Sequence, residues 1–245
     1  IESLWHNGDP KSYASDCLSG LGHFVPQCKR CLVGSWRLHG SWTRAELPAR
    51  APPFVPVMVY ALAQAAFEKG WEDLAILVLL GFDRYARSGE LFFARKGDFT
   101  WNAAKTRAVW SLPLTKSGQR VGAHESLVID DPWLVTALAN YLRALAPGDY
   151  LRTVSPGLMR LRLKTLLKDL DCPEGYQWYS LRRGGATHAF RVSNDLSRVC
   201  FVGRWNSLKT ARIYLTDALA QLTEIQLEPP IRAKLLRLAR KARPR

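Results

Sequence analysis

Apolar residues recur at helical spacing along most of the chain, and only two short stretches read as strands. Residues 12–46 are expected to be helical, with a break near Pro26. Further helices are expected over 58–69, 71–80 (ended or bent by Gly81), 87–93, 130–145, 155–170, 179–191, 195–201, 207–219 and 230–241. The stretches 108–114 and 125–129 are rich in β-branched and apolar residues, which favour strands. A turn at Lys116-Ser-Gly118 lies between them. The pattern predicts a mixed α+β fold that is mainly α.

A proline-rich segment divides the chain. Residues 47–56 contain four prolines in ten positions, and proline removes a backbone donor and disfavours helix in the residue before it. We therefore expect an extended linker at 47–56, between a helical segment at 1–46 and a larger domain at 57–229. Residues 230–245 form a separate basic helix or tail.

Composition narrows the class of protein. Of 245 residues, 47% are hydrophobic, which is enough for a substantial core, and the net charge of +14 favours a polyanionic partner such as nucleic acid. Residues 230–245 carry seven Lys or Arg and no acidic residue, so half of the net charge lies there. Five cysteines in a chain of this length do not indicate a disulfide framework. No apolar run reaches the 18 residues typical of a membrane span, so we expect an intracellular, soluble protein.

Five short elements occur in a fixed order along the chain. They are Arg87-Ser-Gly-Glu90, Thr115-Lys116-Ser-Gly118, Tyr179-Ser-Leu-Arg182, Trp205 and Tyr214. Their order and spacing resemble the catalytic domain of the tyrosine recombinases, the phage-integrase family. The resemblance covers about residues 54–224 and implies helices around a small antiparallel sheet. It also implies that 1–46 is the end of a helical core-binding domain that contacts DNA.

Exchange of a DNA phosphodiester needs a nucleophile, positive charge on the non-bridging oxygens, a base and an acid. The resemblance implies that Tyr214 attacks phosphorus and forms a 3′-phosphotyrosine, so that no cofactor is needed to rejoin the strands. Arg87 and Arg182 would clamp the phosphate, because planar guanidinium groups bind its oxygens in pairs. Lys116 would protonate the leaving 5′-oxygen. Glu90 is expected to orient an arginine rather than to act chemically.

Tyr179 departs from the family pattern, which usually has histidine at that position. A phenol can donate a hydrogen bond to a phosphate oxygen, but its ordinary pKa of about 10 makes it a poor base near neutral pH. Trp205 occupies the second His/Trp position, where its indole N–H can only donate. Arg204 beside it is a candidate phosphate contact. Arg84 lies near Arg87 without the R-x-x-E spacing, and His188 is expected to be a half-buried helix residue.

Several interpretations remain open at this point. The first is an active recombinase or integrase that binds double-stranded DNA as a homotetramer, in a nucleus or with a bacterial nucleoid. The second is a catalytically silent DNA-binding relative, which Tyr179 favours. A type IB topoisomerase or a basic helical adaptor are further alternatives. Cys28 and Cys31 resemble a zinc spacing only loosely, and we expect no metal, membrane or small-molecule cofactor. Leu235, Leu236 and Leu238 are suited to docking on a neighbouring protomer.

Overall fold

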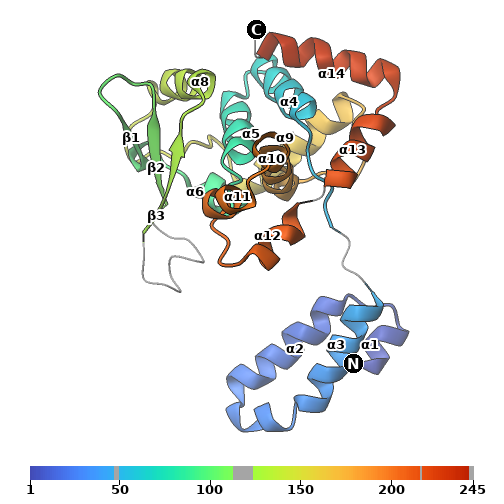
Figure 1. Ribbon diagram of the computed structural model, residues 1–245. Coiled ribbons are helices and arrows are strands. Elements are labelled where there is room, and N and C mark those ends of the chain that lie inside the picture. The colour runs from blue at the N-terminus through green and yellow to red at the C-terminus, as the bar shows by residue number, and fades with distance from the viewer. Residues whose placement is uncertain (47–49, 113–123, 216, 243–245) are drawn as a thin grey trace. The chain divides into compact units, whose positions relative to one another are not determined.

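The computed structural model describes residues 1–46, 50–112, 124–215 and 217–242, and it divides into two compact units (Figure 1). The first unit spans Ile1–Arg50 and the second Ala51–Arg245. Among the described helices, none combines the length and the apolar character needed to cross a bilayer.

The first unit is a small helical bundle. Its elements are α1 (Glu2–His6), α2 (Lys11–Phe24), the 3₁₀ helix η1 (Pro26–Arg30) and α3 (Val33–Ala45). The break expected near Pro26 is confirmed, because α2 ends at Phe24 and the proline opens η1. Trp42 is buried together with Leu18 and Ala14, and the Trp5 ring stacks on it at 6.5 Å between centroids.

The second unit is built around two almost wholly apolar helices, α4 (Pro56–Glu68) and α5 (Glu72–Asp83). Other helices surround this pair (Figure 1): α6 (Ser88–Phe93), α8 (Pro132–Leu142), α9 (Pro156–Asp169), α10 (Trp178–Ser193), α11 (Leu196–Gly203), α12 (Leu208–Tyr214), α13 (Asp217–Gln226) and α14 (Pro229–Ala242). Local signals set several of their ends. Asp131 and Ser155 accept from the backbone N–H groups of Leu134 and Leu158, and a proline follows each cap.

One antiparallel sheet completes the second unit. After the 3₁₀ helix η2 (Lys96–Asp98), its strands β1 (Phe99–Trp101), β2 (Ala108–Leu112) and β3 (Glu125–Ile129) pair in chain order. Trp110 is fully buried and stacks on Phe99, with ring centroids 5.5 Å apart. The fold is therefore mainly helical with a small antiparallel sheet, as predicted. The three-residue strand β1 was not predicted, because so short a segment carries no periodic signal.

Two predicted helix boundaries were wrong. Gly81 does not end its helix: α5 continues to Asp83. A Cβ at Gly81 would lie 2.9 Å from Leu91 and 3.0 Å from Leu181, so this glycine permits close helix packing instead. The helix expected over 207–219 is two helices, because Leu215 is extended after α12 and α13 begins at Asp217. Helix α12 thus ends at Tyr214.

The basic C-terminal helix is confirmed as α14, but it lies against its own unit rather than projecting as a tail. It packs against α4, and Leu235, Leu238 and Ala242 are buried (Figure 1). The expectation that the leucines face a neighbouring protomer was therefore wrong for Leu235 and Leu238. Only Leu236, at 37% exposure, remains on the surface.

Candidate active site

Two glycines set the position of α10, which carries Tyr179 and Arg182. A Cβ at Gly184 would lie 2.2 Å from the Phe54 carbonyl oxygen, and one at Gly185 would lie 1.9 Å from the Phe82 carbonyl oxygen. No real side chain tolerates such distances from backbone atoms, so only glycine lets α10 approach these two segments. Arg182 is thereby brought against the end of α5.

The Arg182 guanidinium is held by two main-chain carbonyls. One Nη donates to the Tyr85 carbonyl, and the other donates to the Gly203 carbonyl at 2.6 Å. Tyr85 has a left-handed backbone (φ 46°), as does Arg204 (φ 55°), the residue that follows Gly203. A bulky residue in this conformation carries strain of about 1 to 3 kcal/mol, which the surrounding structure must offset. The carbonyl of the strained Tyr85 and that of Gly203, which precedes the strained Arg204, thus converge on the same cation.

Three aromatic rings gather beside this guanidinium. Its central carbon lies 4.6 Å from the Trp205 ring and 5.3 Å from the Tyr214 ring. Trp205 and Tyr214 are 4.7 Å apart between centroids, and Tyr179 and Tyr214 are 5.8 Å apart. A Cβ at Gly203 would lie 2.0 Å from Trp205, so glycine is required for the indole to lie there. The cluster unites four of the six predicted site residues: Tyr179, Arg182, Trp205 and Tyr214.

The two phenols have opposite pKa shifts. Burial raises the pKa of Tyr179 to about 12, and its hydrogen bond with Tyr214 acts in the same direction. Burial also acts to raise the pKa of Tyr214, but the hydrogen bond from Tyr179 and the charge of Arg182 outweigh it, so that pKa lies below its ordinary value. Of this pair, Tyr214 is the one that ionises first. Its anion is stabilised by a donor and a cation together.

Burial lowers the pKa of Arg182 to about 10, and the charges of Arg87 and Arg204 lower it further. The guanidinium remains protonated at neutral pH, but it is 1% exposed and surrounded by other cations. The Arg182 Nε–H has no hydrogen-bond partner among the described residues. A cation in such a position is stabilised by an anion brought near it.

Arg87 belongs to the same neighbourhood through Glu90. Arg87 is the N-cap of α6, and its backbone N–H and side chain donate to the two Glu90 carboxylate oxygens at 2.7 and 2.8 Å. Arg204 donates to the same carboxylate at 2.8 Å and to Glu125 at 3.4 Å. Burial opposes ionisation of Glu90, but the charge of Arg204 and these hydrogen bonds outweigh it and lower its pKa. Glu90 therefore orients both arginines, in agreement with the sequence-based expectation.

The remaining candidate residues lie outside this aromatic cluster or outside the described residues. Lys116 lies outside the described residues. The Arg204 side chain is 8% exposed and is held by two carboxylates, so it supports the site through Glu90; its expected phosphate contact stays a prediction. Arg84 forms ion pairs with Asp83 at 2.5 Å and Asp130 at 3.0 Å, which ties α5 to β3 and marks it as structural. The position missed from sequence is Tyr85, whose only signal is its contact with Arg182 across the fold.

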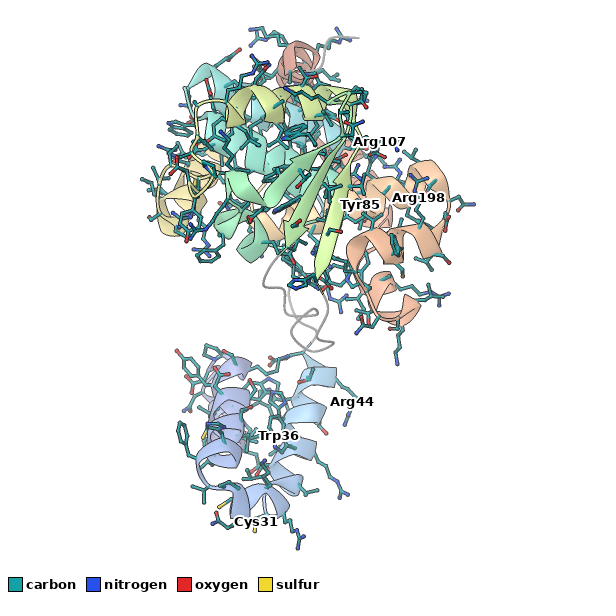
Figure 2. All side chains as sticks on the ribbon, turned by 90° about the vertical axis from the view of Figure 1, so that its left-hand side faces the viewer. Cys31, Trp36, Arg44, Tyr85, Arg107 and Arg198 are labelled. Atoms are coloured by element: carbon teal, nitrogen blue, oxygen red, sulfur yellow. The ribbon has the colours of Figure 1, made fainter. Side chains whose placement is uncertain are left out.

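The first unit carries the two cysteines whose spacing loosely resembles a zinc motif. Cys31 is exposed on that unit (Figure 2) and Cys28 is partly buried. Within residues 1–46, 50–112, 124–215 and 217–242, no group of three or more His, Cys, Asp or Glu side chains could hold a metal ion.

Comparison with solved structures identifies the architecture. The XerA recombinase crystal structure matches with a TM-score of 0.55 at 19% sequence identity, over 75% of this chain and 66% of that chain. The XerH site-specific recombinase bound to its difH substrate before cleavage matches with a TM-score of 0.55 at 16% identity, over 74% of this chain and 55% of that chain. The fold is that of a tyrosine-recombinase catalytic domain. The post-cleavage complex of XerH with palindromic difH matches similarly, with a TM-score of 0.54 at 16% identity over 73% and 54% of the two chains.

At these identities the likeness establishes the tyrosine-recombinase fold and nothing finer. The matches span about two thirds of the XerA chain and just over half of the XerH chain. No protein-family model matches the sequence. The search of curated proteins found no match either.

Proposed function

We propose that the second unit is a DNA strand transferase that cleaves and rejoins strands through a phosphotyrosine at Tyr214. The observation that carries the proposal is the environment of that phenol. It lies beside a buried arginine, receives a hydrogen bond from Tyr179, and has a lowered pKa. A tyrosine placed in this way is primed as a nucleophile toward a phosphodiester, whose negative charge the neighbouring arginine attracts.

Each neighbour then has a role in the exchange. Arg182 and Arg87 bind the non-bridging oxygens, Trp205 donates its indole N–H, and Tyr179 holds the hydroxyl of Tyr214. Lys116, which lies outside the described residues, is assigned the protonation of the leaving 5′-oxygen on the family resemblance alone. These assignments need neither a metal nor a small-molecule cofactor, because the energy of the broken bond is kept in the phosphotyrosine.

Access to the clamp requires a rearrangement within this site. Arg182 is 1% exposed, whereas the side chain of Arg87 is 30% exposed. The Tyr214 and Trp205 rings cover the Arg182 guanidinium. A phosphate would meet Arg87 first and reach Arg182 once the Tyr214 ring moves aside. Since α12 has only seven residues and the chain is extended at Leu215, this short helix is the element best suited to move.

A nicked suicide substrate tests the proposal. Its short fragment diffuses away after cleavage, so a covalent protein–DNA adduct accumulates and is seen on a denaturing gel. We expect an adduct with the wild type, none with Tyr214→Phe, and an unchanged yield with Tyr176→Phe, whose hydroxyl contacts Thr223 instead. An adduct that persists in Tyr214→Phe and disappears in Tyr179→Phe would move the nucleophile to Tyr179.

A second candidate function is that of a DNA-binding relative without cleavage activity. Tyr179 favours it, because a phenol with a pKa of about 12 cannot act as a base near neutral pH. This candidate predicts tight DNA binding and no adduct with the wild type. A type IB topoisomerase, by contrast, would relax supercoiled DNA as a monomer.

The wider assembly follows from the same proposal. In this proposal the partner is double-stranded DNA, and the first unit is the end of a core-binding segment. Four copies of the chain act together on two duplexes. We propose that the protein acts in the nucleus of a eukaryotic host or at the nucleoid of a bacterial host. Gel filtration of the chain with and without a duplex would measure the number of copies per DNA.

A further inference from the structure

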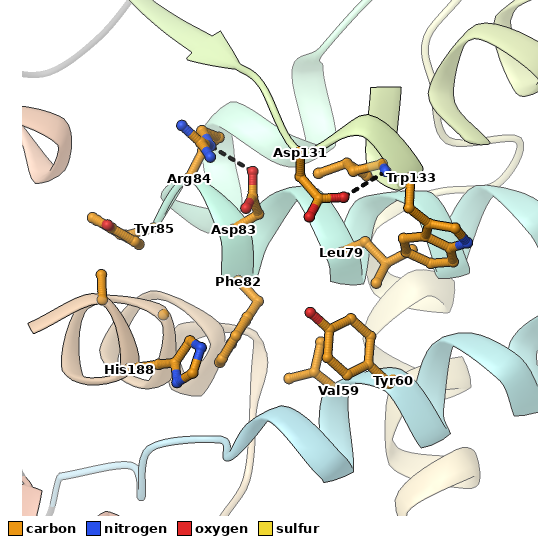
Figure 3. Close-up of a pocket in the computed structure, with 13 residues that line it drawn as sticks. Val59, Tyr60, Leu79, Phe82, Asp83, Arg84, Tyr85, Asp131, Trp133 and His188 are labelled. Carbon is orange, nitrogen blue, oxygen red and sulfur yellow. Dashed lines mark hydrogen bonds and ion pairs between the residues drawn. The ribbon is translucent and has the colours of Figure 1, made fainter. Parts of the chain in front are cut away.

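A cavity that Tyr85 helps to line has no role in the proposed chemistry. Its volume is about 250 Å³, and it lies between α4, the end of α5, the start of α8, and α10. Water occupies about 30 Å³ per molecule in the liquid, so the space could hold a group much larger than one water. Figure 3 shows its main side chains, which include Tyr60, Phe82, Asp83, Asp131 and Trp133.

One wall of the cavity carries more negative than positive charge. Among the described residues that line it, Asp83 and Asp131 are the carboxylates and Arg84 is the one Lys or Arg, and Arg84 also pairs with nearby Asp130. Arg84 is already shared between Asp83 and Asp130 and also donates to the Val128 carbonyl at 2.6 Å. The described lining thus has two carboxylates and one guanidinium, in a protein whose net charge is +14.

Asp83 lies in an environment that opposes its ionisation. Burial raises the pKa of this carboxyl, Arg84 opposes the shift, and the charges of Asp131 and Asp130 add to it. A positively charged guest near Asp83 would act in the same direction as Arg84 and would stabilise the ionised form.

The other walls are aromatic. Tyr60 and Trp133 meet edge to face with ring centroids 6.2 Å apart, and Phe82 stacks on His188 at 5.7 Å. In Figure 3 the Tyr60 hydroxyl and the two aspartates point into the same space. Rings opposed to carboxylates form the kind of site that binds organic cations, because the ring faces attract positive charge while the carboxylates accept hydrogen bonds.

We propose that this cavity binds an alkyl guanidinium, the head group of an arginine side chain, between the carboxylates of Asp83 and Asp131 and the rings of Tyr60 and Trp133. A guanidinium fits better than an ammonium, since its flat face stacks on rings while its edge donates to two carboxylates. The guest would lie one residue from the Arg182 clamp, because Tyr85 lines the cavity and also supplies a carbonyl to Arg182.

The test uses the whole chain without DNA, so its outcome is independent of any cleavage activity. The probe is Nα-acetyl-arginine methylamide, and its neutral analogue Nα-acetyl-citrulline methylamide is the control ligand. Binding is followed by NMR through the Trp133 indole N–H, identified with Trp133→Phe. We expect saturable binding of the arginine probe and at least tenfold weaker binding of the citrulline analogue.

The decisive variant is Asp131→Asn, with Asp195→Asn as its matched control. Both aspartates cap a helix by accepting a backbone N–H at 2.9 Å, and asparagine caps equally well, so both variants should fold. Asp131→Asn should weaken probe binding roughly tenfold, the effect of one charge-assisted hydrogen bond, while Asp195→Asn should leave it unchanged. Wild-type affinity in Asp131→Asn, or equal binding of the two ligands, would overturn the proposal.

Two further ligands separate the sources of the guanidinium. Agmatine represents a free small molecule, and a blocked Ala-Arg-Ala tripeptide represents an arginine presented by a protein. Tripeptide binding at least as tight as that of agmatine assigns the site to a protein side chain, and binding of agmatine alone assigns it to a small molecule. Binding of neither ligand would contradict a guanidinium site.

Discussion

Glu90 and Arg204 lie 114 residues apart in the sequence and form a 2.8 Å ion pair in the interior of the second unit. The same carboxylate caps α6 and orients Arg87, so Arg204 acts on the phosphate clamp through Glu90. Arg204 also reaches Glu125 on β3, which joins α6, α11 and the sheet at one point. The candidate site thus depends on an arginine that acts on Arg87 through a shared carboxylate.

Replacing Arg204 with methionine should destabilise the second unit. The variant keeps most of the side-chain volume but leaves Glu90 and Glu125 without this partner, and breaking a buried ion pair costs about 3 to 5 kcal/mol. We expect a value near the lower end, because Arg87 still contacts Glu90. Urea unfolding measures the change. Arg212→Met, at an exposed position of α12, should shift stability by less than about 0.5 kcal/mol. Equal stability of the two variants would refute the supporting role.

Gly185→Ala should be among the most damaging single substitutions in the chain. Its methyl group would have to occupy space 1.9 Å from the Phe82 carbonyl oxygen, so α10 would be pushed away from α5. We expect a loss of more than about 4 kcal/mol in unfolding free energy.

The matched control for that substitution is Gly157→Ala, in the first turn of α9. There the nearest atom to an added Cβ is the Ser155 Oγ at 3.9 Å, and alanine should stabilise the protein by about 0.5 to 1 kcal/mol. Thermal unfolding of both variants checks the pair. If Gly185→Ala unfolds at the wild-type temperature, the close approach of α10 and α5 is wrong.

Local signals in the sequence were sufficient for much of the fold. The caps at Asp131 and Ser155, each followed by proline, placed the starts of α8 and α9, and β-branched residues placed β3 at 125–129. These features depend on hydrogen bonds between near neighbours in the chain. The order and spacing of the motif residues were likewise enough to predict that Tyr179, Arg182, Trp205 and Tyr214 come together.

Features that depend on distant contacts were not predictable in this way. The Tyr85 carbonyl meets Arg182 across 97 residues, and nothing near Tyr85 in the sequence marks its left-handed backbone. Gly81 looked like a helix break because its packing against Leu91 and Leu181 is tertiary. The leucines of α14 were predicted to dock on a neighbouring protomer. They pack against α4 instead, and the sequence near α14 does not reveal a contact with so distant a segment.

The two phenols should titrate separately, and Tyr179→Phe should raise the pKa of Tyr214. The substitution removes a donor that stabilises the Tyr214 anion while its ring keeps the packing. Wild-type Tyr214 should ionise below its ordinary value of 10 and Tyr179 at about 12. NMR of ¹³Cζ-labelled tyrosine measures both, with Tyr214→Phe as the assignment control. If adduct formation requires the Tyr214 anion, its pH dependence should shift to higher pH in Tyr179→Phe. An unchanged Tyr214 pKa in that variant would show that the two hydroxyls do not interact.

The outer face of α14 should contribute to DNA affinity without sequence preference. Arg232, Arg237 and Arg240 are exposed, whereas Lys234 and Lys241 form ion pairs with Asp171 and Glu68. Each phosphate neutralised adds about 0.9 to the slope of log affinity against log salt, so replacing the three arginines with glutamine should flatten that slope by up to about 2.7. Fluorescence anisotropy with a labelled duplex at several salt concentrations measures it.

Substitution is a sharper test of this helix than deletion, because removing α14 would also uncover α4. Leu238→Ala separates an effect on stability from an effect on DNA binding. We expect it to cost about 2 to 5 kcal/mol of unfolding free energy, because it leaves a cavity, and to leave the salt slope of the folded protein unchanged. Leu236→Ala, at an exposed position beside the arginines, should change neither quantity. If the triple arginine variant keeps the wild-type slope, α14 does not contact phosphates. Loss of recombination in Leu236→Ala with an unchanged slope would instead point to contact between protomers through this one exposed leucine.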